Sequence, residues 1–428
     1  MSKGQIVAAI DIGTSKITTI IANKSFETEK INVIGIATHS SLGLRKSQII
    51  DIEEAVEAIT ESVEAAERMA GCSLSKAFIS LGGVHINSIN SKGVVAIAEP
   101  EGEITAEDVE RVIEAARAVS LPAAREALHV IPRDFIVDSQ EGIKDPLGMT
   151  GVRLEVETHI ITGSSTAMKN IIKCVEELGI EVDSLVFTGL AVAESILTDT
   201  EKELGVCLVD IGGGTTSIAV FMEGSLAYSA VLPVGAKNIT NDLAIGLRVS
   251  LDSAEKIKIA LSGEEKVKEK EARKESEEID FRKLGIKEDI GKTSRKTLVE
   301  GIIRPLLNEI FQMVGDELKK SGYGGSTPAG IVLSGGGAQT VGIAQSCKRT
   351  LSLPVRIGYP NGLSGLVEDI KTPDFATCQG LILYALKQKQ TIEPRFSLPH
   401  LSKFKFKGKM SIGGFGKKII DFIKSFLP

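Results

Sequence analysis

The stretch AIDIGTSKITTII at residues 9–21 is repeated in altered form near mid-chain as LVDIGGGTTSIAV at residues 208–220. Each copy predicts an apolar strand that ends in aspartate, a tight glycine-containing turn, and a second strand of β-branched residues. Glycine lets a backbone turn sharply, and the N–H groups of such a turn can face an anion. One turn alone is a weak signal. Two copies in halves of similar length predict a duplicated fold that grips the phosphates of a nucleotide.

The polar residues of both turns indicate what the turns would hold. Asp11 and Asp210 end their strands, and two carboxylates on the floor of a cleft suit a hydrated Mg2+ ion. Lys16 would bring a positive charge to a phosphate. Glycines would admit phosphate oxygens to the backbone and hydroxyls would donate to them, at Gly13, Thr14, Ser15, Gly212, Gly213, Gly214, Thr215 and Thr216. Alone, each turn is more often an ordinary β-turn that starts with aspartate.

A third glycine turn completes the predicted site. The apolar strand IVLS leads into Gly335, Gly336 and Gly337. Glycines at this point would let a flat base and its ribose stack closely. Three such turns in this order predict a nucleotide-binding protein.

Composition narrows the class of protein. The chain has 428 residues and a net charge of -6, which argues against nucleic acid as a main partner. Its five cysteines are widely spaced and contain no C-x-x-C pair, so we expect buried thiols in a reducing cytoplasm. No run of eighteen apolar residues predicts a membrane-spanning helix, and the first residues lack the layout of a signal peptide.

Strand pairs alternate with helical patterns, which favours an α/β fold of two lobes around a nucleotide cleft. We expect a small α+β subdomain inserted in the first lobe and an amphipathic helix at the C-terminus. The expected segments are 1–76 and 163–195 (first core), 77–162 (insert), 196–240 and 330–387 (second core), 241–329 (outer subdomain of the second lobe), 388–413 (linker) and 414–428 (terminal helix).

The order of the motifs resembles the actin-fold superfamily and, within it, the FtsA family of bacterial cell-division proteins. The stretches that carry the resemblance are IDIGTSK (10–16), THIITGS (158–164), LGVCLVDIGGGTTSIAVF (204–221), LPVGAKNITNDLA (232–244), AEKIK (254–258), IVLSGGG (331–337) and LPVRIGYP (353–360). The resemblance implies a duplicated actin-like (ribonuclease-H-like) fold that binds ATP and Mg2+, with Glu255 and Lys258 reaching the ribose and adenine. It also implies that the insert mediates polymerisation.

The partners implied by the resemblance are filaments of the tubulin-like protein FtsZ, other divisome proteins and the cytoplasmic face of the membrane at the division site, where the Z ring forms. FtsZ-type partners are thought to present an acidic and apolar peptide. A basic groove at Lys292, Arg295 and Lys296, beside Leu298 and Ile302, would suit such a peptide.

One departure from the superfamily concerns catalysis. Hydrolytic relatives carry Glu or Gln just before the helix at 191–197, whereas this chain has Thr188 and Gly189 there. No general base is evident, so we expect slow ATP turnover at most and assign no catalytic residue. The alternatives are an actin-fold pilus-assembly platform protein and a phosphotransferase of the sugar- or acetate-kinase type.

The last fifteen residues, 414–428, separate into two faces when spaced at about 100° per residue. The apolar face contains Phe415, Ile419, Phe422, Ile423 and Phe426, and lysines lie opposite. This pattern is typical of a helix that lies in a bilayer interface, attracted by anionic lipid. The polar linker before it favours a membrane anchor over a helix docked on the protein's own core, a feature that neither alternative class of protein needs.

Overall fold

Two sheets repeat one strand order, as the duplicated motif predicts. The computed structural model describes residues 4–97, 102–268, 279–288, 290–291 and 293–388. The first sheet has the order β11-β6-β1-β2-β3-β17, formed by β11 (Glu181–Phe187), β6 (Lys76–Leu81), β1 (Gly4–Ile12), β2 (Lys16–Ser25), β3 (Ile31–Ser40) and β17 (Ser364–Gly365). The second has the order β16-β15-β12-β13-β14, formed by β16 (Val355–Ile357), β15 (Ile331–Ser334), β12 (Val206–Ile211), β13 (Thr216–Met222) and β14 (Ser225–Leu232).

Strand directions match as well as strand order. In the first sheet β1 pairs antiparallel with β2 and parallel with β6. In the second, β12 pairs antiparallel with β13 and parallel with β15. The two repeated motifs are therefore equivalent central hairpins, β1–β2 and β12–β13, of two copies of one sheet.

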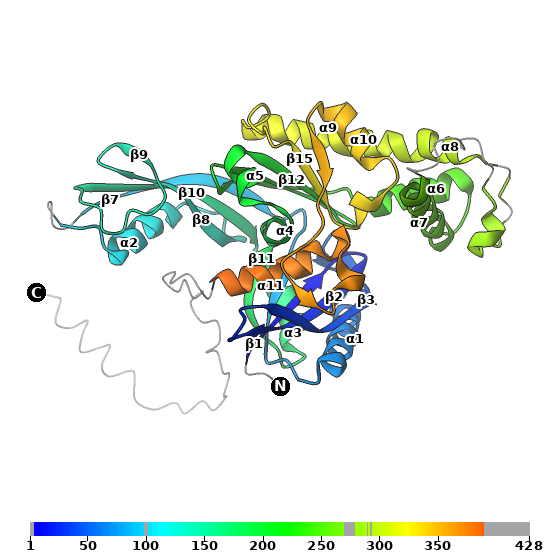
Figure 1. Cartoon of the computed structure of the whole chain (residues 1–428), viewed down its shortest axis with the longest axis horizontal. Coiled ribbons are helices and arrows are strands. Elements are labelled where there is room, and N and C mark those ends of the chain that lie inside the picture. The colour runs from blue at the N-terminus through cyan, green and yellow to red at the C-terminus, as the bar shows by residue number, and fades with distance from the viewer. Residues whose placement is uncertain (1–3, 98–101, 269–278, 289, 292, 389–428) are drawn as a thin grey trace, which may run out of the picture. The chain divides into compact units, whose positions relative to one another are not determined.

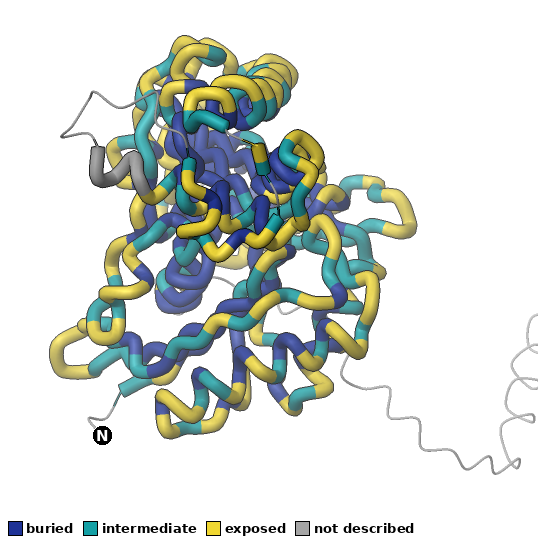
Figure 2. Tube along the Cα trace, turned by 90° about the vertical axis from the view of Figure 1, so that its right-hand side faces the viewer, coloured by how far each residue is buried: buried dark blue, intermediate teal, exposed yellow. Residues whose placement is uncertain are grey.

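Helices from distant parts of the chain pack between and around the sheets. They are α1 (Ile52–Ala70), α3 (Ser165–Glu176), α4 (Thr188–Ile196), α5 (Asp199–Leu204), α6 (Ala236–Leu247), α7 (Leu251–Lys268), α8 (Arg295–Leu298), α9 (Arg304–Ser321), α10 (Ile343–Leu351) and α11 (Ala376–Gln388). Figure 1 shows α11 beside β1 although the two elements lie at opposite ends of the described chain. Helix α4 packs on α11 and contacts strands of both sheets. In Figure 2 the buried residues gather inside the fold and the outer helix faces are exposed.

A four-stranded sheet of order β7-β10-β8-β9 lies within the first half of the sequence. Its elements are β7 (Asn87–Ala96), α2 (Ala106–Arg117), β8 (Arg125–Val137), β9 (Gln140–Ile143) and β10 (Arg153–Ser164). Helix α2 starts with a capping box formed by Thr105 and Asp108. It packs so closely on β7 that a Cβ at Gly93 would lie 2.2 Å from the Val112 carbonyl oxygen. These elements have a hydrophobic core of their own.

Two helices, α6 and α7, follow β14 in the sequence. Arg248 ends α6 in the left-handed conformation, with φ 56°. Ser250 then caps α7 by accepting a bond from the Ser253 N–H at 3.2 Å. The break turns α7 back across α6, and this turn brings Glu255 and Lys258 toward the hairpins.

All the described residues belong to one compact unit. The expected linker and C-terminal helix lie outside the described residues. Within the described part of the chain, no helix has the length and apolar character needed to cross a membrane.

Candidate nucleotide-binding site

The turns of the two central hairpins meet each other directly. Each is closed by the same bond: the Gly13 N–H donates to Lys16 O at 3.1 Å, and the Gly212 N–H donates to Thr215 O at 2.9 Å. A Cβ on Gly213 would lie 2.1 Å from Ser15 Oγ of the opposite turn. We expected this glycine to admit phosphate, but its missing side chain makes room for the other hairpin.

A cavity of about 1000 Å³ opens beside this contact. Its wall includes every predicted nucleotide-binding residue except Gly214 and Thr216. A Cβ on Gly214 would meet Thr14, and the Thr216 hydroxyl donates to the Val234 carbonyl at 2.9 Å. Gly214 and Thr216 therefore also contribute to the hairpin contact and the fold, and their contact with phosphate stays a prediction.

The two strand-end aspartates differ in their neighbours although the duplication makes them equivalent. Strand pairing places Ser334 beside Asp210, as Ser80 lies beside Asp11. Ser80 donates to Asp11 Oδ1 at 2.7 Å and accepts the Ile12 N–H at 3.0 Å. Ser334 turns away and donates to Pro373 O at 3.4 Å. Asp210 Oδ1 is consequently buried without a hydrogen-bond partner.

Burial and these neighbouring groups shift the pKa values of both aspartates. Burial raises the pKa of Asp210 to about 7, with a smaller contribution from the charge of Asp11. Burial also raises the pKa of Asp11, although the Ser80 hydrogen bond and the charge of Lys16 oppose it. A nearly buried carboxylate with an unpartnered oxygen on a cavity wall fits a bound cation, because a cation would satisfy that oxygen. Asp11 and Asp210 therefore suit Mg2+ held largely through water.

Two polar residues that sequence reasoning missed join the hairpins. The Thr14 hydroxyl accepts the Ser47 N–H at 2.8 Å, and Ser47 Oγ lies 3.3 Å from Thr215 Oγ1 of the second hairpin. Lys237 donates from Nζ to Thr14 O at 2.9 Å and also lines the cavity. Ser47 occupies a β-turn outside the quoted motifs, whereas Lys237 lies in the first turn of a helix within the stretch 232–244 but was not singled out there.

Lys16 is engaged by a residue from the other end of the chain. Its Nζ lies 2.5 Å from Asp374 Oδ2 and 3.6 Å from the centre of the Phe375 ring. All three residues belong to the first lobe or to the segment that leads back into it. A phosphate bound by Lys16 would therefore lie near the carboxylate of Asp374.

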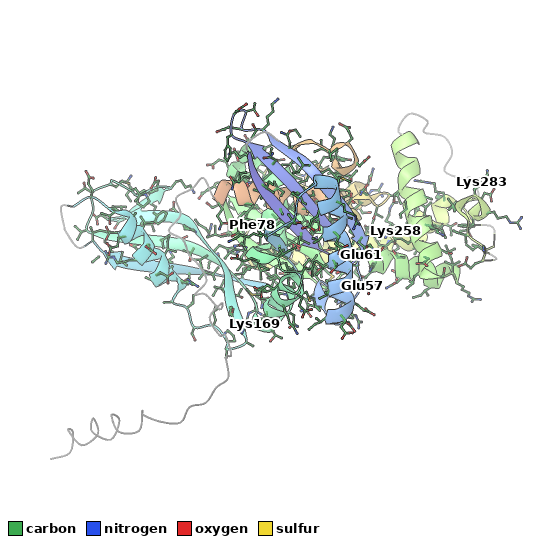
Figure 3. All side chains as sticks on the ribbon, turned by 90° about the horizontal axis from the view of Figure 1, so that it is seen from below. Glu57, Glu61, Phe78, Lys169, Lys258 and Lys283 are labelled. Carbon is green, nitrogen blue, oxygen red and sulfur yellow. The ribbon has the colours of Figure 1, made fainter. Side chains whose placement is uncertain are left out.

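The ammonium group of Lys258, labelled in Figure 3, is hydrogen-bonded to neighbouring groups of the protein. Its ammonium donates to Glu255 Oε2 at 2.7 Å, to Thr240 Oγ1 at 2.9 Å and to Ala236 O at 3.3 Å. These three bonds use all three hydrogens of the ammonium group. Glu255 is 43% exposed, so its other oxygen can accept a hydroxyl of a ligand. Lys258 thus holds Glu255 in place, and both residues line the cavity, where their contacts with the adenine and ribose stay a prediction.

The third glycine turn packs closely against β12. Gly335 has φ 79°, and a Cβ there would lie 2.4 Å from Ile211 O. A Cβ on Gly337 would lie 2.4 Å from Ile211 Cγ2. Gly336 alone is exposed and has room for a side chain, its nearest neighbour lying 3.6 Å away. All three glycines line the cavity, and close stacking of a base on them stays a prediction.

The start of α4 is the place where hydrolytic relatives are expected to hold a catalytic carboxamide or carboxylate. Thr188 lines the cavity there, and a Cβ on Gly189 would press into the Phe187 ring at 2.7 Å. The side chain available at this point is therefore a hydroxyl, which is a poor general base.

Comparison with solved structures defines the class of protein. The PilM-PilN type IV pilus biogenesis complex contains a chain that aligns with a TM-score of 0.63 at 16% identity, covering 89% of this chain and 98% of that one. This likeness is one of fold alone. The chain has an actin-like ATPase fold, as its motifs predicted.

Sequence comparison is more specific. Residues 83–162 match the family model described as "SHS2 domain inserted in FTSA", and residues 207–380 match "Cell division protein FtsA". The chain is 40% identical over 398 residues to the cell division protein FtsA of Pseudomonas aeruginosa, with 91% of each chain covered. It is 41% identical over 391 residues to that of Borreliella burgdorferi, covering 91% of this chain and 93% of the relative. The chain belongs to the FtsA family of actin-like cell-division proteins.

Proposed function

We propose that the cavity binds Mg-ATP and that the bound nucleotide controls a cell-division scaffold. The observation that carries the proposal is the pair of equivalent hairpins, whose aspartates share a cavity and one of which has an unpartnered carboxylate oxygen. Backbone N–H groups and hydroxyls of both turns would receive the phosphates. Glu255 would accept a ribose hydroxyl, and the exposed Gly336 would lie against the base.

Mg2+, when bound, would offset phosphate charge, with Asp11 and Asp210 holding its water shell. The protein's own groups supply binding and orientation but little proton transfer, because Thr188 stands where a general base would be needed. We infer a nucleotide that is held for long periods and hydrolysed slowly. Such a nucleotide would act as a structural switch more than as fuel.

The scaffold role rests on family membership and on the C-terminal sequence. We propose that the chain polymerises through its insert, 77–162, and carries FtsZ filaments to the cytoplasmic face of the membrane at the division site. Residues 414–428 would anchor it to anionic lipid, with Phe415, Ile419, Phe422, Ile423 and Phe426 facing the acyl chains. Many weak anchors along one filament would bind far more tightly than one. Other divisome proteins would join at the same place.

The outer subdomain, 241–329, is the proposed site for FtsZ, with one correction. The groove was expected beside Leu298, but that side chain is fully buried. Arg295 donates from Nη2 to the Leu261 carbonyl at 3.1 Å, and Lys292 lies outside the described residues. Lys296 is exposed and is the member of the expected basic group best placed for an acidic peptide.

Co-sedimentation tests the scaffold role. Vesicles containing anionic lipid, the full chain, Mg-ATP and FtsZ filaments are mixed and pelleted. We expect the wild type to carry FtsZ into the pellet. Phe422→Glu should abolish this, because a charge would have to enter the apolar layer. The matched control Ser425→Gln, on the polar face, should leave it unchanged. A Phe422→Glu protein that still pellets FtsZ with vesicles would contradict the anchor.

A further inference from the structure

Asp374 links Lys16, a lysine of the proposed nucleotide cavity, to Gln339, which follows the third glycine turn. It belongs to a short 3-10 helix, Pro373–Phe375, directly before α11. Its Oδ2 lies 2.5 Å from Lys16 Nζ, at the start of β2. Its Oδ1 accepts a 2.8 Å bond from Nε2 of Gln339, which follows the third glycine turn. One carboxylate therefore ties the first hairpin to the turn expected to face the base.

All the groups of this chain of contacts line the cavity. Lys16, Asp374 and Gln339 belong to its wall, and Asp374 Cβ is also the nearest neighbour of Gly336. The two charged side chains are 26% and 21% exposed, so water screens their attraction only in part. Burial by itself would raise the pKa of Asp374, but the charge and hydrogen bond of Lys16 outweigh it and hold the pKa below its ordinary value. The carboxylate stays ionised at neutral pH.

We propose that Asp374 is a carboxylate latch that competes with a nucleotide phosphate for Lys16. The inference rests on the proposed function, since it concerns the same cavity. A phosphate group at the turn of the first hairpin would draw the Lys16 ammonium toward itself and away from Asp374 Oδ2, which it now contacts at 2.5 Å. The released carboxylate would repel the incoming phosphate unless it moved away with its 3-10 helix.

The latch favours ligands with more negative charge. A triphosphate offers Lys16 a stronger partner than a diphosphate does, and adenosine offers none. The contact between Lys16 and Asp374 would persist with adenosine and break with a triphosphate. Because Asp374 also holds Gln339, opening the latch would free the glycine turn from the first hairpin.

The test is the affinity of the full chain for Mg-ATP, Mg-ADP and adenosine, measured by calorimetry. Asp374→Asn should bind Mg-ATP about twofold to fivefold more tightly than wild type, the range expected for loss of one partly exposed ion pair. Asp374→Ala should act in the same direction. The gain should be smaller for Mg-ADP and absent for adenosine. Asp369→Asn, an exposed carboxylate outside the cavity, is the control of equal charge and should change nothing.

A Lys16→Gln background separates a latch from general repulsion. There Asp374→Asn should change the affinity for Mg-ATP less than twofold, because no ammonium is left to release. An equal gain with and without Lys16 would overturn the latch, as would unchanged or weaker binding by Asp374→Asn in the wild-type background. If neither wild type nor the Asp374 variants bind Mg-ATP, the proposed function fails and the latch with it. If wild type binds and Asp374→Asn gains nothing, only the latch is wrong.

Discussion

Replacement of Asp210 by asparagine should stabilise the protein while it damages the site. The side chain is 5% exposed and its Oδ1 has no partner. Its pKa is about 7 in the folded protein against an ordinary value of 3.8. At about 1.4 kcal/mol for each step of one in pKa, ionised Asp210 costs the fold up to about 4 kcal/mol above pH 7. Asparagine carries no charge and avoids that cost.

The pH dependence is a sharper test than the absolute gain, because asparagine also changes the hydrogen bonding. Between pH 3.8 and about 7 the folded protein holds a proton that the unfolded chain has lost. The contribution of Asp210 to stability therefore falls as pH rises through this window and is level above it. The advantage of Asp210→Asn should grow by about 2 kcal/mol from pH 5.5 to pH 8. For a chain of this size that corresponds to a melting temperature difference of about 2–3 °C.

Thermal melting of the full chain from pH 5.5 to 8.5, with chelator and without nucleotide, measures this difference. Asp316→Asn is the matched control, since that carboxylate is 66% exposed on α9 and pairs with Lys319 at the surface. It should give a small difference that does not follow the same curve. A melting advantage of Asp210→Asn that stays constant or shrinks as pH rises would refute the reasoning about the buried charge.

Three further outcomes follow from the same structure. Gly335→Ala should destabilise the protein by more than about 2 kcal/mol in urea titrations, since a side chain on this left-handed residue would press on the backbone of β12. Gly336→Ala should cost less than about 0.5 kcal/mol and should only weaken nucleotide binding. Equal costs of the two substitutions would contradict the assigned roles. Ser80→Ala should lower the free energy of unfolding by about 2 kcal/mol, because it leaves the buried Asp11 carboxylate without its donor. The equivalent change in the second sheet, Ser334→Ala, should lower it by less than about 1 kcal/mol, because Ser334 donates to a backbone carbonyl instead. His159 is buried, and burial is the main reason that its pKa is lowered to about 3, so the protein loses stability as pH falls below 6.5. His159→Gln should remove about 2 kcal/mol of the stability loss between pH 6.5 and 5. Urea midpoints that fall equally in both proteins would speak against this prediction.

The duplicated fold could be predicted from sequence because its signals are local. Each hairpin is written in thirteen consecutive residues, and strand, aspartate and glycine follow in an order that short-range sterics explain. The resemblance to FtsA proteins and the actin-like fold were confirmed for the same reason. The domain boundaries and the roles of individual site residues stay predictions.

Contacts between distant segments could not be read from local pattern. Asp374 meets Lys16 across 358 positions of sequence, and Ser47 meets Thr215 across 168. Asp374 and Ser47 both lie outside the motifs from which the site was predicted. The glycines show the same limit: pattern indicated that Gly213 and Gly335 need to lack a side chain, but the reason was the opposite hairpin in one case and β12 in the other.

The measurement that tests the account most directly is calorimetric titration of the full chain with Mg-ATP. The account predicts one site per chain, and affinity at least tenfold weaker in both Asp11→Ala and Asp210→Ala, with Asp316→Ala unchanged. A wild-type chain that binds no Mg-ATP would contradict the account. So would unchanged affinity in both aspartate variants, because the paired hairpins would then not be the nucleotide site.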